Sequence, residues 1–219
     1  MLSDECKRKL NVVNKAAAQA KDGRTALMFA AAHKRGEDAN AMVRALLSAG
    51  GQAVNAQDKY GRSALMFAAW KGGEHAAGMM RLLLGAGAAV NAQDNKGWTA
   101  PMLAAQQEGE HGAEMMRVLM QHGGHVAVNK QNEDGMTVLV LTAQFGGEPG
   151  IMRVLLDAGA DANKQNEEGW TALMWAARWG GERGAAMMRL LMQHGGHVAV
   201  NKQSKNGRTA LMIAAERGG

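Results

Sequence analysis

The chain has 219 residues, a hydrophobic fraction of 47% and a formal net charge of +5 at pH 7. This composition excludes a disordered chain, because disordered segments contain too few apolar residues to form a core. The only cysteine is Cys6, which excludes an intrachain disulfide and predicts an intracellular, cytoplasmic protein. No apolar run approaches the roughly 18 residues typical of a membrane-spanning helix, so no membrane partner is expected.

Residues 1–22 are predicted to form an N-terminal capping helix, with its helical part over 3–19. Ser3 is a suitable N-cap, because its hydroxyl can accept a hydrogen bond from a free N–H group of the first turn. Apolar residues then recur at helical spacing, at Cys6, Leu10, Val13 and Ala17. This stripe is suited to covering the first of the units that follow.

One glycine recurs in matching context along the rest of the chain, at spacings of 34 to 38 residues. Each copy is followed by a segment such as TALMFAA, and the first five are then followed by a second apolar segment such as MMRLLLGAG and by NAQD or NKQ. The glycines are Gly23, Gly61, Gly97, Gly135, Gly169 and Gly207. They predict five full repeats and a C-terminal half repeat within a single domain: 23–60, 61–96, 97–134, 135–168, 169–206 and 207–219.

Each full unit is predicted to contain two short helices. A Thr or Ser two residues after the glycine can cap the first helix, and a glycine pair such as Gly72-Gly73 can end it. In the second unit the apolar positions of the two helices are Leu65, Ala68 and Ala69, and then Ala76, Met80 and Leu83. Helices this short are not stable alone, so the units are expected to stack and to bury their apolar faces on one another.

The units also contain extra residues at two places. Those between the helices, as in GGEHAAGMM, are expected to lengthen the second helix by about one turn of 3.6 residues. Those in HGGHVAVN of the third and fifth units contain apolar residues in alternation, such as Val126 and Val128. Alternation is typical of extended backbone, so a longer arm of the turn is expected there.

The repeated TALMFAA segment resembles the opening of the first helix of the ankyrin repeat, T-P-L-H-x-A, and the resemblance covers residues 22–219. It implies an all-α ankyrin-repeat solenoid of stacked helix–turn–helix units with β-hairpin turns. The repeats are longer than the family's usual period of about 33 residues. Ala or Val replaces the family's proline, Met or Val replaces its histidine, and Pro101 stands where leucine is usual.

The resemblance also implies a concave face for partner binding, formed by hairpin tips and first helices. The positions assigned to that face contain six of the chain's aromatic residues, whereas Phe29, Phe67 and Trp175 share one position that indicates core. Aromatic side chains often dominate binding energy, although they could instead brace one hairpin against the next. The candidate partner-binding residues are Lys59, Tyr60, Arg62, Trp70, Lys71, Lys96, Trp98, Glu133, Asp134, Phe145, Glu167, Glu168, Trp170, Arg178, Trp179 and Arg208.

Charge on this predicted face changes sign twice along the chain. Basic residues lie before Glu133, the acidic Glu133, Asp134, Glu167 and Glu168 follow, and basic residues return from Lys205. A uniform polyanion would be repelled in the middle, so a protein or peptide of mixed charge fits better than nucleic acid. A further arginine series on the second helices indicates a solvated outer row: Arg44, Arg81, Arg117, Arg153 and Arg189.

No catalytic or metal site is predicted. His122 with His125 and His194 with His197 lack third and fourth ligands nearby, and nothing places a base beside Cys6. We therefore expect no cofactor, no metal and no enzymatic activity. The predicted function is a monomeric protein–protein interaction module. The alternatives are a self-assembling scaffold, because the last unit ends after one helix and exposes an apolar end, and, third, a nucleic-acid-binding protein using its basic patches.

Overall fold

The computed structural model describes residues 7, 8, 11, 12, 14, 15, 17, 20–32, 37–48 and 54–217. Every described residue between 7 and 17 is helical. The remainder of the predicted capping helix, including its cap Ser3 and the stripe residues Cys6, Leu10 and Val13, lies outside the described residues.

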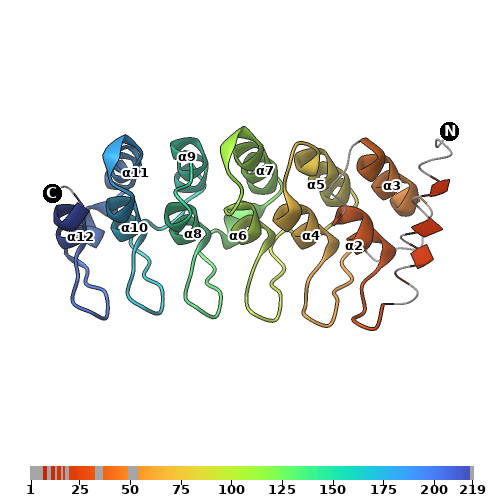
Figure 1. The fold of residues 1–219 in the computed structure, drawn as a ribbon, viewed down its shortest axis with the longest axis horizontal. Helices are drawn as coiled ribbons and strands as arrows, with labels where there is room; N and C mark the ends of the chain where they lie inside the picture. The colour runs from red at the N-terminus through yellow and green to blue at the C-terminus, as the bar shows by residue number, and fades with distance from the viewer. Residues whose placement is uncertain are drawn as a thin grey trace.

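Helices follow one another in pairs, and the pairs stand side by side in one row (Figure 1). Turns form one edge of the row, the first helix of each pair lies next to them, and the second helices form the opposite edge. The pairs are α2 (Ala26–Ala31) with α3 (Glu37–Ser48), α4 (Ala64–Lys71) with α5 (Ala76–Gly85), α6 (Ala100–Ala104) with α7 (Gly109–Gln121), α8 (Val138–Gln144) with α9 (Pro149–Asp157) and α10 (Ala172–Trp179) with α11 (Gly181–Gln193), before a last helix α12 (Ala210–Arg217). The predicted all-α solenoid is confirmed.

The first helix of each full unit begins as the sequence predicts. In α4 the Ser63 hydroxyl accepts from the Met66 N–H at 3.4 Å, and in α6 the Thr99 hydroxyl accepts from the Met102 N–H at 3.3 Å. Gly72 ends α4. The caps satisfy donors that a helix leaves free at its start, and they fix the residue at which each helix begins.

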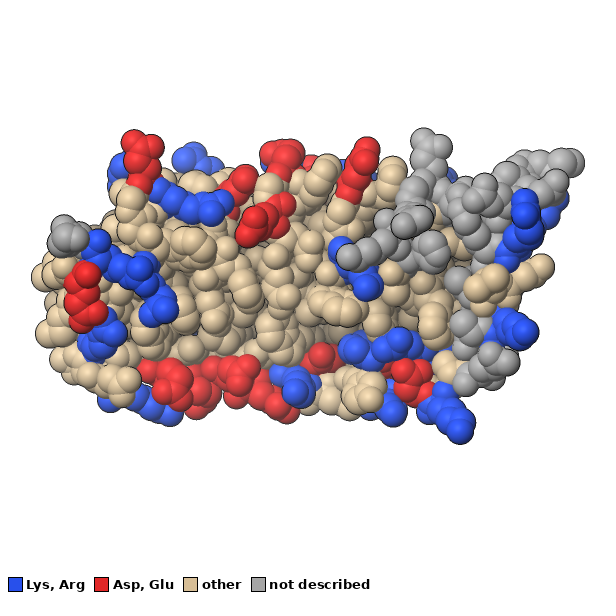
Figure 2. Space-filling model, in the orientation of Figure 1, with Lys and Arg blue, Asp and Glu red and all other residues tan. Residues whose placement is uncertain are grey.

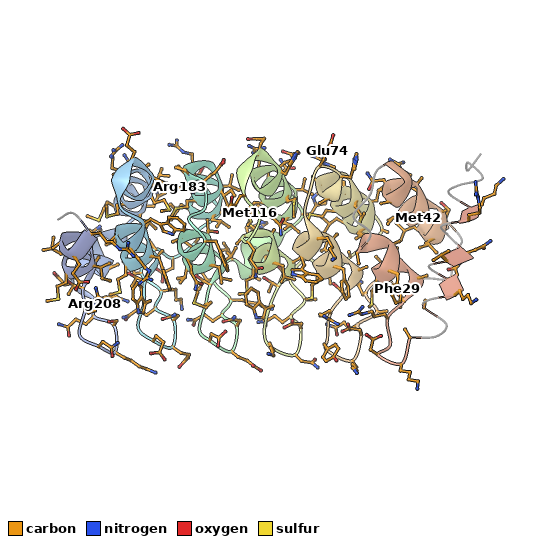
Figure 3. All side chains as sticks on the ribbon, in the orientation of Figure 1. Phe29, Met42, Glu74, Met116, Arg183 and Arg208 are labelled. Atoms are coloured by element: carbon orange, nitrogen blue, oxygen red, sulfur yellow. The ribbon has the colours of Figure 1, made fainter. Side chains whose placement is uncertain are left out.

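The core is a continuous row of leucine, methionine and alanine side chains shared by adjacent units. The predicted residues of the second unit, Leu65, Ala68, Ala69, Ala76, Met80 and Leu83, are all buried. Met42 and Met116 are fully buried between first and second helices (Figure 3). Helices of 5 to 13 residues are too short to be stable in isolation, so contacts between helices must stabilise them.

Extra residues between the helices have different effects in different units. The second helices α7 and α11 each have 13 residues, whereas α9, in the unit with the fewest extra residues, has 9. In the second unit, however, α5 begins only at Ala76 and has 10 residues, because Gly73 to His75 remain in the turn that precedes it. The expected extra turn of helix therefore forms in α7 and α11 but not in α5.

The turns are bound to one another by backbone hydrogen bonds. Within one turn the Asp94 N–H donates to Trp98 O and the Gly97 N–H donates to Asp94 O, both at 2.9 Å. Each turn also donates an N–H to the turn before it, as Glu133 does to Lys96 O at 3.0 Å and Glu167 does to Asp134 O at 2.9 Å. Among the described residues only Gln165 and Thr171 form an isolated β-bridge, so these hairpins are tight turns and not paired strands.

Side-chain amides form two further ladders along the row. The Gln131 Nε2 donates to Gly135 O in its own turn and to Gln165 O in the next, at 2.6 and 2.9 Å. Asn129 uses both ends of its amide, donating to Gly159 O at 2.9 Å and accepting from the Asp161 N–H at 2.7 Å. Gln57, Gln93 and Gln165 repeat the two glutamine bonds and Asn55 repeats both asparagine bonds, so adjacent turns are fixed at several points.

The extended arm expected around Val126 and Val128 is wrong. Gly124–Ala127 and Gly196–Asn201 form the 3-10 helices η1 and η2, and Val126 is 76% exposed. An extended arm needs partners for its backbone groups, and the adjacent units have two residues fewer at this point. The inserted residues therefore bond to themselves, as the Val126 N–H does to Gly123 O at 3.1 Å.

This insertion also changes the asparagine ladder. Asn91 still donates to Gly123 O at 2.9 Å, but its buried Oδ1 has no hydrogen-bond partner among the described residues. Asn163, which precedes the second 3-10 helix, has the same unpaired Oδ1. Lysines that follow the insertions bond instead to backbone oxygens, Lys130 to Asn91 O at 3.1 Å and Lys202 to Asn163 O at 2.6 Å.

Gly97→Ala should destabilise the stack more than a substitution at a glycine with open surroundings. Gly97 has φ +76°, and a Cβ on it would lie 2.8 Å from the Asn132 Cα of the next turn. Gly87 has φ +88°, but a Cβ on it would meet nothing within 4 Å, so Gly87→Ala is the matched control. Left-handed backbone costs each alanine about 1–2 kcal/mol, and Gly97→Ala should lose more because the turns must separate. Equal losses in urea unfolding would contradict this.

Candidate recognition face

We define the recognition face as the turns together with the exposed parts of the first helices. Of the predicted binding residues, the exposed ones are Lys59, Tyr60, Trp70, Lys96, Glu133, Asp134, Phe145, Glu167, Glu168, Arg178 and Trp179. The half-buried ones are Arg62, Lys71, Trp98, Trp170 and Arg208. The set therefore divides into residues that are accessible at the surface and residues that are partly enclosed by the stack.

Trp98 and Trp170 belong to the second group. Both are partly buried and pack against the hydrophobic core. The Trp170 ring lies 4.5 Å from the Trp175 ring, centre to centre, with the planes tilted by 36°. Both tryptophans therefore pack within the stack, and Trp170 contacts a residue of the first helix of its own unit.

Four other aromatic side chains are exposed on the recognition face. The exposed fractions are 49% for Tyr60, 48% for Trp70, 37% for Phe145 and 46% for Trp179. Trp179 is oriented by its Nε1, which donates to Gln144 O at 3.2 Å, whereas the Lys71 ammonium lies 4.5 Å from the centre of the Trp70 ring. These two tryptophans therefore present rings that are partly held in place but still open to contact.

Arg62 has a structural role that its sequence position did not indicate. Its Nε and Nη2 donate to Asp58 Oδ2 at 2.9 and 2.6 Å, and the Asp58 side chain has no exposed surface. The guanidinium also lies 4.6 Å from the Tyr60 ring centre and 4.9 Å from that of Phe67. Arg62 thus holds one turn against its first helix.

Asp58 organises the same turn through its other oxygen. Its Oδ1 accepts the N–H groups of Tyr60 and Arg62, both at 2.9 Å. Burial alone would raise the pKa of this carboxyl. The side-chain hydrogen bonds and charge of Arg62, together with the two backbone donors, outweigh burial and hold the Asp58 pKa below its usual value.

Charged side chains follow the edge of the molecule formed by the turns. Figure 2 shows an acidic stretch along this edge, with basic groups on both sides of it. The exposed residues Glu133, Asp134, Glu167 and Glu168 lie in this part of the row, between Lys96 and Lys205. Glu168 is paired with Lys205 at 3.4 Å, and Arg208 forms an ion pair with Glu216.

Two hollows open beside the exposed tryptophans. The first has a volume of about 140 Å³ and is lined by Arg62, Met66, Phe67, Trp70, Asp94 and Leu103. The second has a volume of about 360 Å³ and is lined by Gln144, Trp175, Arg178, Trp179 and Arg217. Sequence reasoning assigned Trp175 to the core, and it placed Gln144 and Arg217 on the predicted face without making them binding residues. The hollows themselves were not predicted, because each forms only between adjacent units.

The second-helix arginines form the predicted outer row. Arg44, Arg81, Arg153 and Arg189 are exposed and Arg117 is half-buried. Glu114 joins two units of this row, because it forms ion pairs with both Arg81 and Arg117. Hydrogen bonds and charges within this cluster lower the Glu114 pKa, and those from Glu110 and Glu114 raise the Arg117 pKa.

The histidine pairs lie at the ends of second helices. The His122 Nδ1 is 2.8 Å from Val118 O and the His125 Nδ1 is 3.3 Å from Met120 O, so each contacts a helix carbonyl. His194 contacts Leu190 O in the same way at 2.9 Å. Within the part of the chain that the structure describes, no three His, Cys, Asp or Glu residues lie together in a group that could hold a metal ion.

Comparisons with known proteins agree with this architecture. A family model described as "Ankyrin repeats (3 copies)" matches residues 3–94, 74–166 and 139–219. The chain therefore belongs to the ankyrin repeat family. No curated protein matches the sequence.

Two solved structures have the same fold. The ankyrin repeat protein EF0377 has a TM-score of 0.73 and 24% identity, covering 88% of this chain and 91% of its own. An ankyrin repeat domain of Acinetobacter baumannii AYE, ABAYE2397, has a TM-score of 0.72 and 29% identity over the same shares. Ankyrin repeats generally mediate protein–protein interaction and are typically not enzymes. No helix in the described ranges is long and apolar enough to span a membrane.

Asp58→Asn should lower stability in a pH-dependent way. Because folding lowers the Asp58 pKa, its ionised form stabilises the fold above the unfolded pKa of about 3.9. That contribution is lost as the pH falls below this value and through the folded pKa. At pH 7 the variant should lose about 1–3 kcal/mol, and its difference from the original chain should shrink as the pH falls below about 4.

Urea unfolding of both chains at several pH values measures this difference. Asp94→Asn is the matched control, because Asp94 occupies the same turn position and its Oδ1 also accepts two backbone N–H groups. Four residues after Asp94 stands Trp98, whereas four residues after Asp58 stands Arg62, so only Asp58 has a guanidinium partner of this kind. Among the described residues the control has no guanidinium partner, so at pH 7 it should lose less stability than Asp58→Asn. A loss at Asp58 that stays constant from neutral to strongly acidic pH would contradict the assignment.

Proposed function

We propose that this chain is a non-catalytic interaction module that binds a protein or an extended peptide on its concave recognition face. The observation that supports this most directly is the exposure of Tyr60, Trp70, Phe145 and Trp179 on that face. Large aromatic rings are enriched among the residues that dominate binding energy at interfaces. The family's general role in protein–protein interaction supports the same conclusion.

Charge then sets the register of the bound partner. The acidic stretch at Glu133, Asp134 and Glu167 favours basic groups of the partner, while Lys59 and Lys96 favour acidic ones nearer the N-terminal end. A nucleic-acid backbone, which carries the same charge throughout, fits this alternation poorly. We place the protein in the cytoplasm, on the basis of its single cysteine.

A self-assembling scaffold is the second candidate. On α12, Leu211 and Met212 are 73% and 51% exposed, whereas Leu173 and Met174, at the same positions of the preceding unit, are 4% and 0% exposed. Another repeat-like surface could cover these residues in the way that α12 covers α10. Light scattering that shows concentration-dependent assembly, abolished by Leu211→Gln with Met212→Gln, would favour this second candidate.

Trp70→Ala combined with Trp179→Ala should abolish partner capture while the fold persists. Affinity capture from lysate of the native source measures binding, and circular dichroism with thermal melting measures folding. Loss of a dominant contact costs about 2 kcal/mol or more, which is roughly a 30-fold weaker complex. The matched control is Val126→Ala with Val198→Ala, exposed apolar residues outside the recognition face.

A third variant separates binding from bracing. Trp170→Ala should lower the melting temperature, because it removes a ring packed on Trp175 and the core. If the Trp70 and Trp179 variant captures the same partners as the original chain, the recognition face is placed wrongly. If it unfolds, the exposed aromatics brace the stack and do not bind.

A further inference from the structure

Three successive units contribute side chains to the larger hollow. Gln144 comes from the end of α8, Trp175, Arg178 and Trp179 come from α10, and Arg217 comes from the end of α12. Its volume of about 360 Å³ can accommodate a side chain of a partner. Trp179 forms part of the wall and contacts the unit of α8, because its ring occupies the space where a Cβ on Gly146 would be.

The two arginines at this hollow are not neutralised within the described part of the chain. Neither Arg178 nor Arg217 forms an ion pair there, whereas Arg24, Arg62 and Arg208 on the same face each pair with a carboxylate. The Arg178 guanidinium lies 5.9 Å from the centre of the Trp175 ring. Flat, aromatic surroundings of this kind hold a guanidinium while its N–H groups stay available to an acceptor.

The two tryptophans of the wall differ in the hydrogen bonding of their indole nitrogens. The Trp175 Nε1 is buried and has no hydrogen-bond partner among the described residues, whereas the Trp179 Nε1 is already bonded to Gln144 O. An unpaired buried N–H is unfavourable. Because its Nε1 is buried away from solvent, Trp175 contributes a wall to the hollow and not a donor. The hollow thus combines two cations without an ion pair in the described chain with tryptophan walls, and the two cations favour an oxygen anion.

We propose that this hollow binds a carboxylate of the partner, held between the guanidinium groups of Arg178 and Arg217 against Trp175 and Trp179. A planar carboxylate matches the paired N–H groups of a guanidinium. The acidic residues Glu167 and Glu168 belong to the turn of the same unit, so a singly charged group flanked by neutral or basic residues fits better than a doubly charged phosphate. This assignment rests on the proposed function, and it specifies the chemistry of one anchor.

A library of random 12-residue peptides, selected on the full chain, tests the proposal. Each selected peptide is synthesised in three forms, which have at the acidic position the selected Glu or Asp, the matching amide Gln or Asn, or phosphoserine. Each form is made with a free and with an amidated C-terminus. Fluorescence anisotropy measures their affinity. Peptides should require a carboxylate, and its replacement by the amide should weaken binding about tenfold, which is roughly 1.4 kcal/mol.

That tenfold loss should disappear on the variant Arg178→Gln with Arg217→Gln. Its matched control is Arg153→Gln with Arg189→Gln, which removes equal charge from exposed second-helix positions without an ion pair among the described residues. The amidated set shows whether the carboxylate belongs to a side chain or to the peptide C-terminus. If the tenfold difference between the carboxylate and amide peptides shrank equally on both double variants, charge in general, and not this hollow, would attract the peptide.

Trp70→Ala makes a failure of this inference distinguishable from a failure of the proposed function, because Trp70 lies at the other hollow. Peptides that weaken on Trp70→Ala but bind the Arg178 and Arg217 variant unchanged would overturn the carboxylate site alone. Peptides indifferent to all of these substitutions would overturn both. Selection that yields no peptide, or peptides that prefer phosphoserine, would also overturn the carboxylate site.

Discussion

No helix pair in this chain can bury its own apolar face, and the stacked architecture follows from that constraint. Each first helix has apolar residues on more than one side, and residues such as Leu65, Met66 and Ala68 are buried only because adjacent units cover them. Amide ladders through Gln131 and Asn129 add directional bonds to this burial, because they span adjacent turns. Burial therefore stabilises the stack, while the ladders set the register of one turn on the next.

The same constraint determines where a binding surface can lie. Interior positions are occupied by leucine, methionine and alanine that both neighbours need, and the exposed aromatic residues lie in the turns and at the ends of first helices. Two hollows form there at junctions between units, one beside Trp70 and one beside Trp179. Each hollow is accordingly formed by two or three consecutive units and not by any single one.

Features set by local chemistry could be predicted from the sequence. Thr99 caps a helix because its hydroxyl is beside free N–H groups, and Gly97 is required because its φ is +76°. Features that depend on a neighbouring unit could not be predicted. Trp98 and Trp170 proved half-buried, Arg62 was already paired with Asp58, and the residues around Val126 formed a 3-10 helix because adjacent units offered no backbone partner. Trp175 was predicted to be core, and the hollow that it lines with Arg217 could not be predicted because it exists only between stacked units.

Deleting one unit tests most directly whether the units are stabilised by the interfaces that they share. Urea unfolding compares the full chain with a chain from which residues 97–134 are deleted, so that Lys96 is joined to Gly135. Deleting one unit removes one interface, so the free energy of unfolding and the m-value should both fall, and the transition should stay cooperative. If the free energy of unfolding stayed unchanged after the deletion, the units would fold independently of one another. That result would contradict stabilisation by stacking.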